Sequence, residues 1–153
     1  MTNYLKTAYD DLIVIIKAQY PRFIDPGRIA VEMLIGGEVQ LEKSMLGYED
    51  CIIIVPSDTQ TEETSMILTS GGSLATYNMR LLYYKPKILE NEFDSVTDFA
   101  ESLCNYLKEN YTHNSGKLII LDIGVNYDVP IPEGYEGQLY GFDISFTFTV
   151  GKY

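Results

Sequence analysis

The last apolar stretch of the chain alternates strictly between apolar and polar residues. In residues 142–150 one parity holds Phe142, Ile144, Phe146, Phe148 and Val150, and the other holds Asp143, Ser145, Thr147 and Thr149. This period of two predicts a strand that is buried on one face only. A long apolar face on a strand must be covered, so another part of the chain is expected to pack on it.

A helix over residues 95–111 is the best cover for that face. Its apolar residues recur at spacings of three and four and draw one stripe: Val96, Phe99, Ala100, Leu103, Cys104 and Leu107. Ser95, with Asp98 three residues later, resembles a capping box and marks the start of the helix. We therefore expect Phe142, Phe146 and Phe148 to pack on this stripe.

A second amphipathic helix is predicted at the N-terminus. Thr2 or Asn3 can cap it, and Pro21 ends it near Gln19 or Tyr20. One face of this helix carries Tyr4, Leu5, Ala8, Leu12, Ile15 and Ile16. The two helices are expected on one face of a sheet.

The remaining segments supply the strands of that sheet. Residues 51–55 form a short, continuously apolar run that ends at Pro56, which predicts a central strand buried on both faces. Further strands are predicted at 28–35, 38–42, 74–85 and 117–127, the last with Ile119, Leu121, Ile123, Val125 and Tyr127 on one face. Short turns marked by glycine or proline favour antiparallel neighbours, so the predicted class is α+β, one domain over residues 1–153.

Two segments are predicted to stay off the core. Residues 57–65 are almost wholly polar, include Asp58, Glu62 and Glu63, and predict a projecting loop or a flexible hairpin tip. The prolines and glycines of residues 130–137 predict a broad, exposed turn. The second face of the sheet, rich in Thr, Ser, Asp and Tyr, is then left for solvent or a partner.

The charge of the chain limits its partners. Eleven basic residues against 22 acidic ones give a net charge of -11, so the average surface repels nucleic acid. Cys51 and Cys104 lie in apolar patterns and are expected to be free thiols in a reducing compartment. No run is apolar enough for a membrane span and no secretion signal is recognisable, which predicts a soluble protein that is not secreted by the usual route.

The sequence offers little catalytic chemistry. Its one histidine, His113, lies in a polar loop, where a solvated side chain is favoured over a general base. The glycine pairs lack the further residues of a phosphate-binding loop, and one histidine cannot build the common zinc sites. We expect no enzyme activity, no cofactor and no metal.

Tyrosine is the candidate contact residue. The chain has 13 tyrosines and no tryptophan, and tyrosine is enriched at protein interfaces. The contact candidates are Tyr83, Tyr84, Tyr135 and Tyr140. Half-buried strand positions are an equally good explanation of these residues.

Three segments together resemble the tail terminator (tail completion) proteins of long-tailed bacteriophages. They are the strand Tyr-Asn-Met-Arg-Leu-Leu-Tyr-Tyr at 77–84, the helix at 99–107 and the strand at 140–150. The resemblance implies a homohexameric ring that caps the tail tube and meets the head–tail connector at the tail–neck junction of the virion, after assembly in the host cytoplasm. It implies a structural role without catalysis, with the chain itself, the tail tube protein and the connector as partners.

Within such a ring, Asp58, Glu62 and Glu63 are expected to face the channel, where acidic side chains would let DNA pass without binding it. Two alternatives remain open at this stage. One is another neck, joint or tube subunit of a phage tail, and the other is a non-viral small-molecule-binding or regulatory α+β domain.

Overall fold

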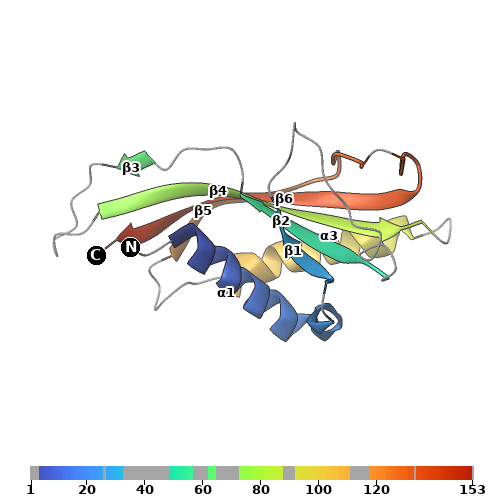
Figure 1. Cartoon of the computed structure of the whole chain (residues 1–153), viewed down its shortest axis with the longest axis horizontal. Coiled ribbons are helices and arrows are strands. Elements are labelled where there is room, and N and C mark those ends of the chain that lie inside the picture. The colour runs from blue at the N-terminus through green and yellow to red at the C-terminus, as the bar shows by residue number, and fades with distance from the viewer. Residues whose placement is uncertain are drawn as a thin grey trace.

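The structure is a computed structural model, and it describes residues 4–25, 27–32, 49–56, 62–64, 73–87, 92–110, 118–132 and 134–152. In chain order the elements are α1 (Tyr4–Gln19), η1 (Pro21–Ile24), β1 (Ile29–Val31), β2 (Cys51–Pro56), β3 (Glu62–Thr64), β4 (Ser73–Pro86), α3 (Phe93–Asn110), β5 (Leu118–Asn126) and β6 (Leu139–Lys152). Figure 1 shows one sheet with both helices on the same side of it.

The sheet confirms the predicted α+β class. Its strand order is β1-β2-β4-β6-β5, and β3 pairs with β4 off this path. All pairs are antiparallel except β1 with β2, which are parallel. Because β6 pairs along the whole of β4, β2 and β3 share the other edge of β4 at different points.

The main core lies between the sheet and the two helices, as the apolar stripes predicted. Phe142 and Phe146 of β6 belong to one buried cluster with Leu103 and Leu107 of α3, and the half-buried Phe99 packs against it. The helix α1 adds Ala8, Leu12 and Ile16 to this cluster. The side chain of Phe148 lies outside the described part of the chain.

The second face of the sheet is only half open, which corrects the expectation of a fully uncovered face. A smaller buried cluster there contains Cys51, Ile53, Val55, Leu82 and Tyr84. Val129 and Ile131, from the segment between β5 and β6, and Leu139, the first residue of β6, pack on it. The exposed turn predicted at residues 130–137 is therefore only partly right. Residues 134, 136 and 137 are exposed, but Ile131 packs on the sheet on the side opposite the helices (Figure 1).

Four local predictions need correction. The prediction of a projecting loop is wrong at residues 62–64, which form β3 and pair with Leu74–Thr76 of β4. They can pair there because β2 leaves this part of the β4 edge unpaired. The single apolar face predicted for residues 119–127 is interrupted by a register shift between Ile120 and Asp122.

The third correction concerns the start of α3, which lies at Phe93, two residues before the predicted capping position. The Ser95 hydroxyl donates to the Glu92 carbonyl oxygen at 2.9 Å instead of capping. The fourth concerns β1, which is shorter than the predicted strand at 28–35 and pairs with β2 in parallel. The hairpin partner predicted at 38–42 lies outside the described residues.

Candidate functional site

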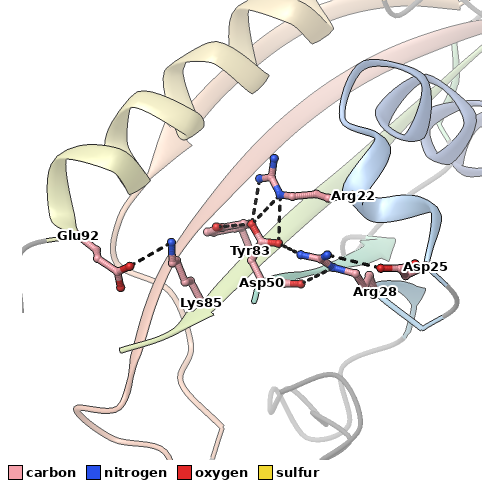
Figure 2. Close-up of polar contacts among 7 residues, drawn as sticks. All are labelled: Arg22, Asp25, Arg28, Asp50, Tyr83, Lys85 and Glu92. Carbon is pink, nitrogen blue, oxygen red and sulfur yellow. Dashed lines mark hydrogen bonds and ion pairs between the residues drawn. The ribbon is translucent and has the colours of Figure 1, made fainter. Parts of the chain in front are cut away.

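The most concentrated polar chemistry of the described chain surrounds Asp50. This residue is 4% exposed and precedes β2 directly. Its carboxylate accepts hydrogen bonds from Nε and Nη2 of Arg22 at 2.9–3.2 Å and from the Tyr83 hydroxyl at 2.7 Å. Nη2 of Arg28 also donates to it, and Nε of Arg28 donates to the Asp50 carbonyl oxygen at 3.1 Å. Figure 2 shows both arginines converging on the one carboxylate.

This Asp50 cluster joins four parts of the fold. Arg22 comes from η1, Arg28 from the turn before β1, Asp50 from the start of β2 and Tyr83 from the middle of β4. Two guanidinium groups share one carboxylate, so the pair of arginines is not neutralised by Asp50 alone. Asp25 lies 3.9 Å from Arg28 and is well exposed, which gives only weak additional compensation.

Burial holds the Tyr83 hydroxyl and the neighbouring Cys51 thiol in their neutral forms. The pKa of the Tyr83 hydroxyl lies well above its usual value because of burial and because the Asp50 carboxylate is close. Burial and Asp50 also raise the pKa of the Cys51 thiol to about 12. A thiol with that pKa is protonated near neutrality and is a poor nucleophile. The cluster therefore has the chemistry of a structural ion pair, not of an acid–base or nucleophilic catalyst.

A hollow of about 280 Å³ opens beside the cluster, and we call it the Arg22 hollow. Arg22, Tyr83, Lys85, Ser95 and Phe99 line it, together with Glu49 and Asp50. Lys85 is 17% exposed and has one ion pair, 3.4 Å from Oε1 of Glu92. Figure 2 shows Arg22 and Lys85 reaching toward this space from η1 and β4.

A second polar group lies on the open half of the other sheet face. Arg80 of β4 donates from Nε and Nη2 to Asp143 of β6 at 3.1 and 2.6 Å, and Ser145 donates to the same carboxylate at 2.8 Å. Thr147 donates to the Asn78 side chain at 2.7 Å. A shallow hollow of about 180 Å³ lies among these residues. Asp122 of β5 also lines it. We call this region the polar face.

The edge of the sheet next to the polar face is β5. Among the described strands, β5 pairs only with β6. Gly124 of β5 pairs with Ser145, and a Cβ atom placed on Gly124 would meet nothing within 4 Å. An unpaired strand edge can accept another strand, so this side of the subunit is a candidate contact surface.

The structure divides the predicted tyrosine contacts. Tyr83 and Tyr84 are 2% and 0% exposed, so the prediction that they form contact surface is wrong. Their hydroxyls are also used inside the subunit, by Asp50 and by the Pro130 carbonyl oxygen. Tyr135 and Tyr140 are partly exposed and stay contact candidates.

The predicted channel residues are only partly placed. Glu62 and Glu63 lie on β3, opposite Thr76 and Ala75 of β4. Asp58 and His113 lie outside the described residues. The role of these residues in lining a channel stays a prediction.

Sequence reasoning missed the Asp50 cluster. Arg22 and Asp50 are 28 residues apart, and no periodicity connects them. The available signal was a carboxylate directly before the apolar run at Cys51, together with two arginines around the turn at 25–27. Charged residues placed against buried segments are often paired, and these three form such a group.

In the described ranges, no three His, Cys, Asp or Glu side chains come close enough together to hold a metal ion. Cys51 and Cys104 are free and buried, as expected. None of the described helices is long and apolar enough to cross a bilayer.

Comparisons with known proteins assign no family to this chain. No protein-family model matches the sequence, and no curated protein matches it. Among solved structures 18 chains match, and one of them aligns with 95% of this chain and 96% of its own length at 12% sequence identity and a TM-score of 0.45. A likeness this distant carries no argument about function.

Proposed function

We propose that this protein is a structural subunit of a phage tail, a tail terminator that closes into a homohexameric ring on the end of the tail tube and meets the head connector. The observation that carries the proposal is the β5 edge beside the polar face. A closed ring needs two different patches on each subunit, and an unpaired strand edge supplies one of them. The resemblance of three segments to tail terminators supplies the biological setting.

The chemistry of the described residues supports an assembly role. Arg22 and Tyr83 both bond to the buried Asp50 carboxylate within the subunit, and the Cys51 thiol is protonated near neutrality. The polar face instead presents partly exposed side chains from three neighbouring strands. Such a surface can form hydrogen bonds to a neighbouring subunit. Because it is polar, it does not expose a large apolar area to water when the subunit is alone.

Oligomeric mass in solution and with tail tubes tests the ring. We expect a hexamer by native mass spectrometry and rings at tube ends by electron microscopy. A protein that stays monomeric and never binds a tube end would exclude the proposal. A tube subunit, the nearest alternative, would instead extend into long tubes.

The substitution Gly124→Lys tests the edge itself. The lysine side chain has open space in the subunit, so the monomer should fold normally, but it should obstruct a neighbour that approaches β5. Ala18→Lys, on the exposed side of α1, is the matched control for adding a positive charge. We expect Gly124→Lys to lower the assembled mass and Ala18→Lys to leave it unchanged. Equal masses for both variants would exclude β5 as the ring contact and leave the ring itself standing.

The proposed channel residues need a separate test. Converting Glu62 and Glu63 to lysine on β3 should leave the ring assembled and make it retain DNA, with retention that falls as salt rises. A lysine variant that assembles and binds no more DNA than the original protein would exclude this stretch from the channel.

A further inference from the structure

The Arg22 side chain is held rigidly at the wall of the Arg22 hollow. Its Nε and Nη2 atoms bond to Asp50, and its guanidinium carbon lies 4.5 Å and 4.6 Å from the ring centres of Phe23 and Phe99. A side chain fixed in this way loses little conformational entropy when it binds a further group. The conformational entropy of the Arg22 side chain is therefore already lost when the subunit folds, before any ligand binds.

One part of the Arg22 guanidinium still has hydrogen-bonding capacity. No described residue accepts a hydrogen bond from its Nη1 atom, and Figure 2 shows that this nitrogen points away from Asp50. Arg22 is about one-third exposed, so the atom can be reached from outside. The hydrogen bonds that fix Arg22 thus leave the two N–H groups of Nη1 for a ligand.

Lys85 adds a second donor at the same hollow. Its one ion pair, to Glu92, is long at 3.4 Å, although the side chain is mostly buried. An ammonium group has three N–H donors, and within the described residues this one has a single distant acceptor. An acceptor placed in the hollow would satisfy a second of these three donors.

The charge around the hollow limits which anion fits. Of the charged residues that line the hollow, Arg22 and Lys85 are positive, and Asp50 and the exposed Glu49 are negative. The two carboxylates disfavour a doubly charged phosphate more than a group with one negative charge. A carboxylate has two oxygens, so it can accept from the Nη1 atom of Arg22 and from the Lys85 ammonium group at once.

We propose that the Arg22 hollow is a carboxylate-binding site in which Arg22 and Lys85 donate to the bound group. The carboxylate can come from an acidic side chain of a second subunit or from a free carboxylic acid. The site lies on the helix-covered side of the sheet, away from the polar face, so it does not depend on the proposed ring contact. Two exposed apolar residues lie close in sequence to residues that line the hollow: Ile24 in η1 and Phe93 in α3. Exposed apolar side chains beside the site favour a protein as the source of the carboxylate.

Acetate is the probe that tests the site. The chain has three arginines, so the Nε–H signal of Arg22 can be assigned in a ¹⁵N spectrum by one substitution to lysine. We expect acetate to shift the Arg22 signal and the backbone amides of Ser95 and Val96, and to leave the Arg80 signal in place. Sodium chloride at equal ionic strength is the reference. No shift beyond that of chloride, or a stronger response to phosphate than to acetate, would overturn the proposal.

Substitutions of Lys85 and Glu49 should change acetate affinity in opposite directions, and a substitution of Lys87 is the control. Lys85→Gln should weaken acetate binding about tenfold, because a hydrogen bond to a charged group is lost. Lys87→Gln makes the same change of charge two residues further along the chain, just after β4 and outside the hollow, and should have no effect. Glu49→Gln should tighten binding by about twofold to fivefold, because an exposed like charge is removed. Equal acetate affinity in the Lys85→Gln and Lys87→Gln variants would contradict the proposal.

The same variants identify the source of the carboxylate. If Lys85→Gln, but not Lys87→Gln, also lowers the assembled mass, the carboxylate belongs to a neighbouring subunit. If acetate binding weakens and the mass is unchanged, the carboxylate belongs to a free acid. Since acetate binding is measured on the subunit itself, a protein that fails to form rings can still pass this test.

Discussion

Tyr83 and Tyr84 are neighbours in β4, yet they lie in two different cores on opposite faces of the sheet. Tyr83 belongs to the large cluster under the helices and donates to the Asp50 carboxylate at 2.7 Å. Tyr84 belongs to the small cluster on the other face and donates to the Pro130 carbonyl oxygen at 2.5 Å. Both hydroxyls are satisfied, one by a charged side chain and the other by the backbone of an irregular segment.

The comparison separates two ways of covering a sheet. The helices α1 and α3 bring regular apolar stripes, and on the same side of the sheet the ion pairs of Asp50 connect η1 and the turn before β1 to the start of β2. The segment between β5 and β6 covers the other face with a few apolar side chains and one hydrogen bond from Tyr84. The first arrangement connects distant parts of the chain, so its loss should cost more free energy of unfolding than the loss of the second.

The largest effect is expected for Asp50→Asn. The substitution removes the buried carboxylate that Arg28 and Arg22 share, and breaking a buried ion pair costs about 3–5 kcal/mol. Asp143→Asn is the matched control on the other face, because Asp143 is equally buried but its partner Arg80 is 26% exposed and can reach water. We expect the control to cost about 1–3 kcal/mol. Urea unfolding measures both, and similar losses would show that the two carboxylates are equivalent.

The same contrast explains what could be predicted from the sequence. The stripes of α1 and α3 and the alternation in β6 are periodic, so the helix-covered core was predictable. Val129, Ile131 and Leu139 lie among prolines and glycines without a period, so their role as a cover was not. The Asp50 cluster depends on contacts between Arg22, Asp50 and Tyr83, which come together only when η1, β2 and β4 are in place.

Two further features depend on chain pairing and not on local pattern. The parallel pairing of β1 with β2 differs from the antiparallel neighbours that the turns marked by glycine and proline favoured. The register shift in β5 inserts a residue into an alternation that otherwise looks continuous. Residue periodicity predicts which segments are strands, but it does not predict which residues of neighbouring strands pair.

The next effect concerns the helix-covered core. Leu103→Ala on α3 removes a fully buried side chain that shares a cluster with Phe142 and Phe146, and it should cost about 2–5 kcal/mol. Ser102→Ala, at the neighbouring exposed position, is the control, since its hydroxyl contacts only Tyr20 at the surface. A loss below about 1 kcal/mol for Leu103→Ala in urea unfolding would contradict the packing of α3 on β6.

A smaller effect is expected on the second face, at Gly141. A Cβ atom there would lie 2.8 Å from Cγ2 of Val129 and 3.0 Å from the Tyr83 carbonyl oxygen. Gly141→Ala should therefore overpack this cover and cost about 1–3 kcal/mol. The double substitution with Val129→Ala removes the closest atom and should cost less than the sum of the two single changes. Strict additivity in thermal unfolding would show that Val129 does not cover the sheet at this point.

The smallest effects per group should appear at alkaline pH, where both faces contribute. Burial raises the pKa values of Cys51, Tyr83 and Tyr84 above their ordinary values of 9.0 for the thiol and 10.0 for the phenols. In the unfolded chain these groups lose their protons at the ordinary values, while the folded protein keeps them protonated. Above each ordinary value the folded state therefore binds more protons than the unfolded state, and its stability falls as pH rises.

The slope of this fall can be assigned to each face. Stability should be constant with respect to these groups below pH 9, begin to fall with Cys51 and fall more steeply above pH 10 as the two tyrosines join. Each group adds a slope of at most about 1.4 kcal/mol per pH unit. Tyr84→Phe should remove one such contribution from the second face, and Tyr83→Phe should remove one from the first. Urea unfolding from pH 8 to pH 11 measures the slopes, and an unchanged slope above pH 10 in Tyr84→Phe would mean that the second core already opens at that pH while the helix-covered core stays closed.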